Sequence, residues 1–163
     1  MADETILNTA CQYDDEAEQK KFLEQRQAQM QEDFAKPFDP DCVLEVRHLR
    51  KTFPLKKTLM GKVTKELVAV DDISFKLKAG ETLGIVGESG CGKSTLGRTM
   101  MGIYKPTKGK LIYGGKEVDL SDKKERFAFA KKAQIIFQDP YASLDPRMTV
   151  GEIIAEGMEI HGM

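Results

Sequence analysis

Hydrophobic and polar residues alternate along several short stretches of the chain that follow residue 42. Alternation of this kind is typical of β-strands with one buried face. It predicts strands at Val43–Arg47, Leu67–Val70, Ile73–Leu77 and Leu111–Tyr113. The basic, glycine-containing stretch Lys56–Lys65 separates the first two strands and is predicted to be a hairpin loop. These elements together indicate an antiparallel β subdomain.

Two other stretches, Thr82–Val86 and Ile135–Phe137, are continuously apolar, which is typical of strands buried on both faces of a sheet. Apolar residues at helical spacing predict helices at Ser94–Met101, Asp122–Lys132 and Val150–Met158. The fold class predicted from these elements is α/β. A sheet that ended at Ile135–Phe137 would leave an apolar edge unpaired, so we expect association through that edge.

The first 41 residues form a charged segment with few apolar positions. Residues 1–42 carry 11 acidic and 4 basic side chains, and Pro37 and Pro40 close this segment. We therefore predict a partly disordered or helical extension over residues 1–41 and a domain over residues 42–163. A solvated extension is favoured over an arm that docks on a partner.

The composition, with 40% hydrophobic and 31% charged residues among 163, fits one globular domain. The part after residue 42 is basic but has no aromatic-basic stripe, so nucleic acid is not expected as a partner. Cys11, Cys42 and Cys91 share no metal-ligand spacing, which favours free thiols in a reducing compartment such as the cytosol. No signal peptide or apolar run of membrane-spanning length is present, so a membrane role would require partners.

A glycine-rich motif between the apolar stretch ending at Val86 and the helix starting at Ser94 carries the clearest chemistry. It fits the pattern G-x-x-x-x-G-K-[ST], in which backbone N–H groups cradle phosphates at a helix N-terminus. The expected nucleotide-binding residues are Gly87, Glu88, Ser89, Gly90, Cys91, Gly92, Lys93, Ser94 and Thr95. Lys93 is expected to reach the β- and γ-phosphates, and the Ser94 hydroxyl to ligate Mg²⁺. The predicted ligand is a magnesium nucleoside triphosphate.

A second block, Phe137–Glu152, has the sequence FQDPYASLDPRMTVGE. Together with Val86–Arg98, this block resembles the ATPase subunits of bacterial oligopeptide and dipeptide importers of the ATP-binding-cassette superfamily. The resemblance extends from Val43 to Met163. It implies a P-loop ATP-binding cassette with an antiparallel β subdomain.

The resemblance also implies roles for two residues outside the phosphate-binding loop. Gln138 would approach Mg²⁺ and the γ-phosphate, so that Lys93 and Gln138 are the expected catalytic residues and Ser94 and Gln138 the expected metal ligands. Phe53 would stack on adenine. From spacing alone, Gln138 is equally well explained as a cap at a strand end, and an isolated Phe53 is better explained as a core residue. Leu67–Asp71 is similar to a magnesium-binding strand but precedes the loop, so Asp71 and Asp72 are predicted to start a turn.

The implied function is to hydrolyse ATP, with Mg²⁺, and so power peptide import at the cytoplasmic face of the cell membrane. The implied partners are transmembrane permease subunits, a second ATPase subunit and, indirectly, an extracytoplasmic peptide-binding protein. The chain has no Leu-Ser-Gly-Gly-Gln-like signature, no apolar run ending in Asp-Glu after Gln138 and no switch histidine. We therefore expect the C-terminal half of the cassette to be missing and turnover to be low. A fragment that binds nucleotide or docks on a partner, and a soluble P-loop ATPase or kinase, are the alternatives.

Overall fold

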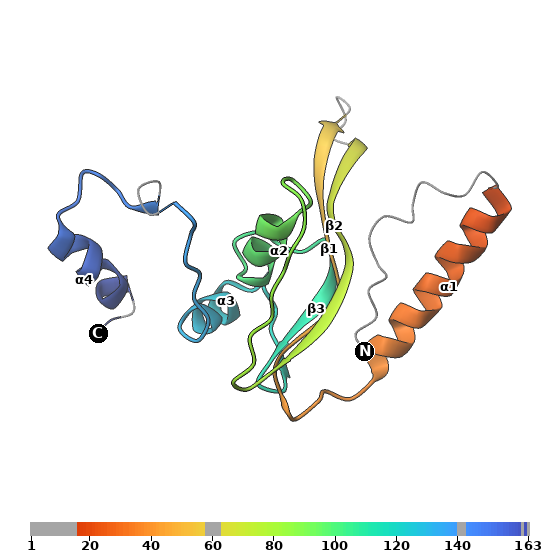
Figure 1. The fold of residues 1–163 in the computed structure, drawn as a ribbon, viewed down its shortest axis with the longest axis horizontal. Helices are drawn as coiled ribbons and strands as arrows, with labels where there is room; N and C mark the ends of the chain where they lie inside the picture. The colour runs from red at the N-terminus through yellow and green to blue at the C-terminus, as the bar shows by residue number, and fades with distance from the viewer. Residues whose placement is uncertain (1–15, 58–62, 140–142, 161, 163) are drawn as a thin grey trace.

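The computed structural model describes residues 16–57, 63–139, 143–160 and 162. Its centre is a four-stranded antiparallel sheet in the order β2-β1-β3-β4. The strands are β1 (Cys42–Lys57), β2 (Val63–Lys78), β3 (Lys108–Tyr113) and β4 (Lys116–Glu117). Figure 1 shows helix α1 (Glu16–Ala35) on one side of the β1–β2 hairpin and α2 (Lys93–Met100) on the other. Helices α3 (Lys123–Ala130) and α4 (Val150–Ile160) follow.

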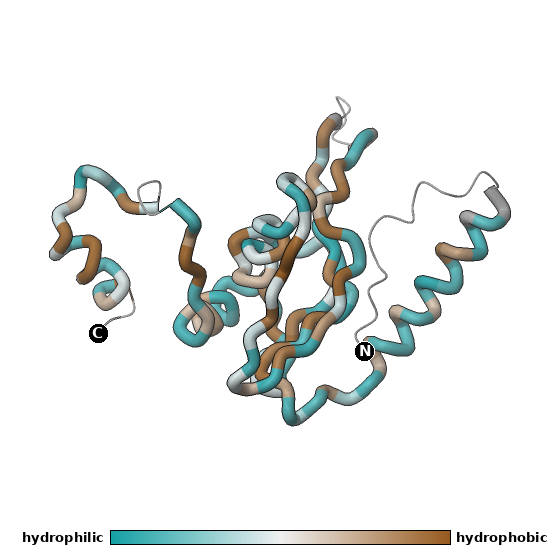
Figure 2. Tube along the Cα trace, in the orientation of Figure 1, coloured by the Kyte–Doolittle hydropathy of each residue, from teal (hydrophilic) through white to brown (hydrophobic). Residues whose placement is uncertain are grey.

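The core lies between the sheet, α2 and α3, and it is built from the apolar positions of the alternating stretches. Figure 2 shows these hydrophobic segments along the sheet and a mainly hydrophilic α1. The buried cluster consists of Val46, Leu49, Val70, Leu96, Leu111, Leu120 and Phe129. Strand β1 extends past the end of β3, so Pro54, which lacks an N–H, pairs only with β2, at Glu66.

The antiparallel subdomain predicted from the sequence is confirmed, with one correction. Leu67–Val70 and Ile73–Leu77 belong to one continuous strand, β2, and Asp71 and Asp72 do not form a turn between two strands. Instead the β1–β2 register shifts on both sides of Leu49, and Asp72 adopts a φ of 56°. An irregularity in the ladder accommodates this left-handed backbone while pairing continues. The predicted loop Lys56–Lys65 has its centre, residues 58–62, outside the described residues.

The two predicted buried strands are not strands in this structure. Residues 81–86 have no regular structure, and Val86 is 89% exposed. Residues 133–137 are likewise irregular, and Ile136 is 97% exposed. A strand is stable only when neighbouring strands satisfy its backbone groups, and within the described residues neither stretch pairs with another strand. The apolar pattern therefore predicted that both stretches would be buried, and in this structure they are not.

The helices agree well with the prediction. Helix α2 contains most of Ser94–Met101, α3 lies within Asp122–Lys132, and α4 contains Val150–Met158. Helix α4 has no buried residue and exposes apolar side chains at Val150, Ile154 and Met158. The N-terminal extension contains a helix, α1, that contacts β1. Because residues 1–15 are outside the described residues, the division of the chain after residue 41 remains a prediction.

Candidate nucleotide-binding site

The glycine-rich loop runs directly into α2, and its glycines adopt conformations that other residues avoid. Gly90 has a φ of 84° and Gly92 a φ of 103°. A β-carbon on Gly92 would lie 2.2 Å from the carbonyl oxygen of Ala69 in β2, and one on Gly87 would lie 2.7 Å from the Cys91 sulfur. Only glycine fits these positions, so the backbone can bend into a compact cradle.

The N-terminus of α2 is not capped by a side chain. Gly92 is its N-cap residue, no side chain bonds to its first N–H groups, and no acidic residue lies in its first turn. Helix α3 differs, because the Asp122 carboxylate accepts hydrogen bonds from the N–H groups of Lys124 and Glu125. The first N–H groups and the positive end of the dipole of α2 are therefore suited to an anion.

The Lys93 ammonium group is held within the loop. Its Nζ donates to the carbonyl oxygens of Gly87, at 2.6 Å, and Glu88, at 2.7 Å, and lies 3.6 Å from the Cys91 sulfur. These contacts curl the loop around a positive charge. A phosphate bound in the loop would meet this charge together with the N–H groups of α2.

Helix α2 is fixed to the core by its opposite face. Leu96 and Thr99 are buried, and the Thr99 hydroxyl donates to the Thr95 carbonyl oxygen at 2.7 Å. Ser94 is exposed and Thr95 is half-buried in the first turn. The exposure of Ser94 is compatible with a metal ligand at this position, and that role stays a prediction.

Phe53 lies in β1 in an aromatic cluster. Its ring makes a T-shaped contact with Tyr104, with centroids 5.4 Å apart, and the Lys51 Nζ lies 4.7 Å from its centroid. The side chain is half-buried. Tyr104 and Lys51 therefore both pack against the Phe53 ring, and its role in stacking on adenine stays a prediction.

Gln138 is exposed in a bend that follows the irregular residues 133–137. Its neighbour Phe137 lies beneath Arg98 of α2, with the guanidinium carbon 5.9 Å from the ring centroid. Arg98 also donates to the Tyr104 hydroxyl at 3.5 Å.

Arg98 and Tyr104 were not predicted from the sequence as parts of the site. They link α2 to the segment that carries Phe53 and to the segment that carries Gln138. No motif marks them, because the contact depends on how the segments fold together. Pro140 and Tyr141 lie outside the described residues.

The loop, the α2 N-terminus and the α/β fold define a P-loop nucleotide-binding protein. The family model described as ABC transporter matches residues 70–161. The chain belongs to the ABC transporter family.

Curated relatives show which branch of the family is similar. The chain is 49% identical over 124 residues to the oligopeptide transport ATP-binding protein AppF of Bacillus subtilis, covering 76% of this chain and 38% of that protein. It is 53% identical to the putative oligopeptide transport ATP-binding protein YkfD of the same organism, covering 74% and 35%. With the glutathione import ATP-binding protein GsiA of Escherichia coli, identity is 46%, covering 77% and 20%. The chain therefore spans little more than a third of the length of its first relatives.

A solved structure of MJ0796, described as a dimeric bacterial ABC transporter cassette, shares the fold. The TM-score is 0.57 at 22% identity, covering 72% of this chain and 47% of that chain. Within the residues that the structure describes, no helix combines the length and apolarity needed to cross a bilayer.

Proposed function

We propose that this chain binds ATP with Mg²⁺ through Gly87–Thr95, within a subunit whose ATP hydrolysis powers the import of peptides. The observation that carries this proposal is the loop Gly87–Gly92 with its left-handed glycines, together with the Lys93 ammonium group and the uncapped N-terminus of α2. The names of the oligopeptide and glutathione import relatives support peptide-class substrates.

Each residue of the site has a distinct role in this proposal. Backbone N–H groups of the loop bind phosphate oxygens, and Lys93 neutralises charge on the β- and γ-phosphates. Ser94 is a ligand of Mg²⁺, and Gln138 senses the metal and the γ-phosphate from the bend that it occupies. Phe53 stacks on adenine through the part of its half-buried ring that Lys51 and Tyr104 leave exposed. Bound ATP supplies the phosphoanhydride bond that is hydrolysed.

The proposed partners follow from the same relatives. An import ATP-binding subunit needs transmembrane permease subunits to move its substrate, and an extracytoplasmic binding protein to deliver a peptide. The dimeric MJ0796 cassette supports a second ATPase subunit as a further partner. We place the protein at the cytoplasmic face of the membrane, where ATP is available.

Calorimetric titration with ATP and Mg²⁺ tests this function. We expect saturable binding that Lys93→Ala abolishes and that Lys124→Ala, an equal charge change at an exposed position of α3, leaves unaltered. Phosphate release in the same sample separates hydrolysis from binding alone. Failure of the unaltered chain to bind ATP, or equal binding by Lys93→Ala, would contradict the proposal.

A further inference from the structure

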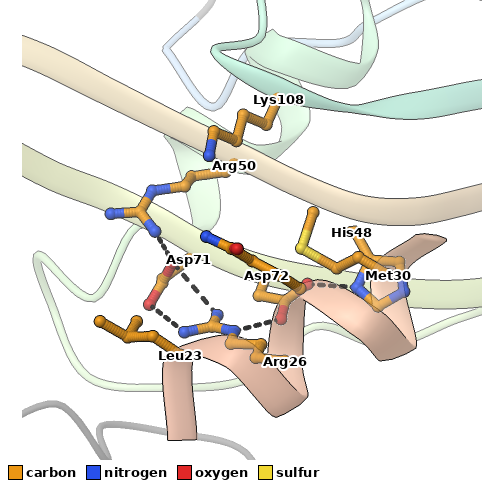
Figure 3. Close-up of a pocket in the computed structure, with 9 residues that line it drawn as sticks. Leu23, Arg26, Met30, His48, Arg50, Asp71, Asp72 and Lys108 are labelled. Carbon is orange, nitrogen blue, oxygen red and sulfur yellow. Dashed lines mark hydrogen bonds and ion pairs between the residues drawn. The ribbon is translucent and has the colours of Figure 1, made fainter. Parts of the chain in front are cut away.

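A cluster of charged residues fastens α1 to the sheet (Figure 3). The Arg26 Nε donates to the Asp72 carboxylate at 2.5 Å, and its guanidinium also pairs with Asp71 at 3.2 Å. His48 lies between two carboxylates, with Nδ1 2.5 Å from Asp72 and Nε2 3.0 Å from Asp33 of α1. The side chains of His48 and Asp72 are 10% and 16% exposed, so this pair is largely shielded from solvent.

A second set of contacts fixes the C-terminal end of α1. The Arg47 guanidinium donates to the carbonyl oxygens of Asp33, Lys36 and Pro37 at 2.7 to 2.9 Å. Arg47 is itself buried and is paired with Glu45 at 2.8 Å. These three carbonyls lie at or just beyond the last turn of the helix, where acceptors have no intrahelical partner. Arg47 therefore acts as a cationic cap that joins α1 to β1.

The strand segment that receives Arg26 also supports the phosphate-binding loop. Ala69 places its carbonyl oxygen against Gly92, and the next residue, Val70, belongs to the buried cluster that contains Leu96 of α2. The two aspartates that bind Arg26 follow immediately in β2. Along β2, Ala69, which contacts the loop, thus lies two positions before Asp71 and three before Asp72, which both contact α1.

The backbone of β1 and β2 near these contacts departs from regular β geometry. His48 has a φ of 50° and Asp72 a φ of 56°, and the β1–β2 register shifts on both sides of Leu49. Left-handed conformations of residues with a β-carbon persist only where surrounding contacts hold them. The charged contacts with α1 supply that constraint at both residues.

We propose that α1 is part of the nucleotide site and that Arg26 is a positioning residue, which holds β2 at Ala69–Asp72 and thereby shapes the phosphate-binding loop. This inference rests on the proposed function. The family model starts at residue 70, so Arg26 lies outside the part of the chain that it matches.

Hydrogen exchange and ATP titration of the full chain test the inference. In Arg26→Gln we expect faster exchange in α1 and also in the nucleotide-free loop 87–92, and ATP binding about fivefold weaker. Lys21→Gln, with the same charge change at an exposed position of α1, is expected to match the unaltered chain in both measurements. Asp72→Asn is expected to reproduce the effects of Arg26→Gln, because Asn tolerates the φ of this position.

The double variant Arg26→Gln/Asp72→Asn is expected to lose less affinity than the sum of the two single losses, because both variants remove the Arg26–Asp72 pair, while Arg26 also contacts Asp71 and Asp72 also contacts His48. Faster exchange in α1 with unchanged exchange in loop 87–92 would overturn the inference and leave the proposed function intact. ATP binding that is absent from the unaltered chain would instead overturn the proposed function, while the exchange measurement would still report whether α1 shapes the loop.

Discussion

The carbonyl oxygen of Ala69 occupies the space where a β-carbon on Gly92 would have to lie, at a separation of 2.2 Å. The phosphate-binding loop and β2 are therefore in direct backbone contact at the N-cap of α2. Glycine is favoured at this position for two reasons. The two backbones approach closely, and the residue adopts a left-handed φ of 103°.

Gly92→Ala is expected to destabilise the chain by about 2 kcal/mol or more. The left-handed conformation alone costs about 1–2 kcal/mol, and the contact with Ala69 adds to it. Gly97→Ala within α2 is the matched control, because a β-carbon there meets nothing within 4 Å, and it is expected to stabilise by up to about 1 kcal/mol. Denaturant unfolding measures both, and equal stabilities would show that the loop does not rest on β2.

Cys91 provides a chemical probe of the loop. Its thiol is free and exposed, and it lies 3.6 Å from the Lys93 ammonium group. We expect a maleimide on Cys91 to block ATP binding, and saturating ATP with Mg²⁺ to slow the labelling several-fold. Cys42 is buried and is expected to react slowly in both conditions. Mass spectrometry of labelled peptides separates Cys91 from Cys42 and Cys11, and labelling of Cys91 unaffected by ATP would place the nucleotide elsewhere.

Phe53→Ala is expected to weaken ATP binding by up to about tenfold, since an aromatic contact contributes about 0.5–1.5 kcal/mol. Binding of inorganic tripolyphosphate, which has no base, is expected to be unaffected by Phe53→Ala and lost in Lys93→Ala. Phe53→Tyr retains the ring and is expected to restore ATP affinity. If Phe53→Ala weakened the two ligands equally, the ring would support the fold instead of binding adenine.

Docking of α1 is expected to fail in acid. Burial disfavours the charged form of Asp72, but hydrogen bonds from Arg26 and His48 outweigh it and hold its pKa below the ordinary value of 3.8. Lys36 and His48 likewise lower the pKa of Asp33. A carboxylate with a lowered pKa stabilises the folded state above its unfolded pKa, and this contribution is lost as pH falls through the folded pKa.

Protection of α1 amides, corrected for the intrinsic pH dependence of exchange, is therefore expected to persist from about pH 7 to about pH 5 and to decline below about pH 4. Asp72→Asn removes one of the two titrating carboxylates and should lose protection even at neutral pH. A decline centred well above pH 5 would show that another group controls docking.

Local chemistry explains which expectations from the sequence were confirmed. The helix that follows the glycine-rich motif depends on hydrogen bonds between residues close in sequence, and it is present. The strand Leu111–Tyr113 is present because the distant strand β1 pairs with it, at Leu44 and Val46. The expected strands at Thr82–Val86 and Ile135–Phe137 depend on distant neighbours and are absent. The sequence also misassigned Asp71 and Asp72, because their partner Arg26 is 45 and 46 positions away.

The sequence by itself determined the form of the glycine-rich loop, because left-handed glycines and the helix that follows act through the local backbone. It also determined the antiparallel strands, whose alternation matches one buried face. Only the tertiary structure decided that α1 docks on the sheet, because the few apolar residues of that helix form no continuous face and its ion pairs to Asp71 and Asp72 follow no periodicity. Only the tertiary structure, likewise, decided that Ala69 supports Gly92, because close approach of two backbones depends on how strand and loop cross in space.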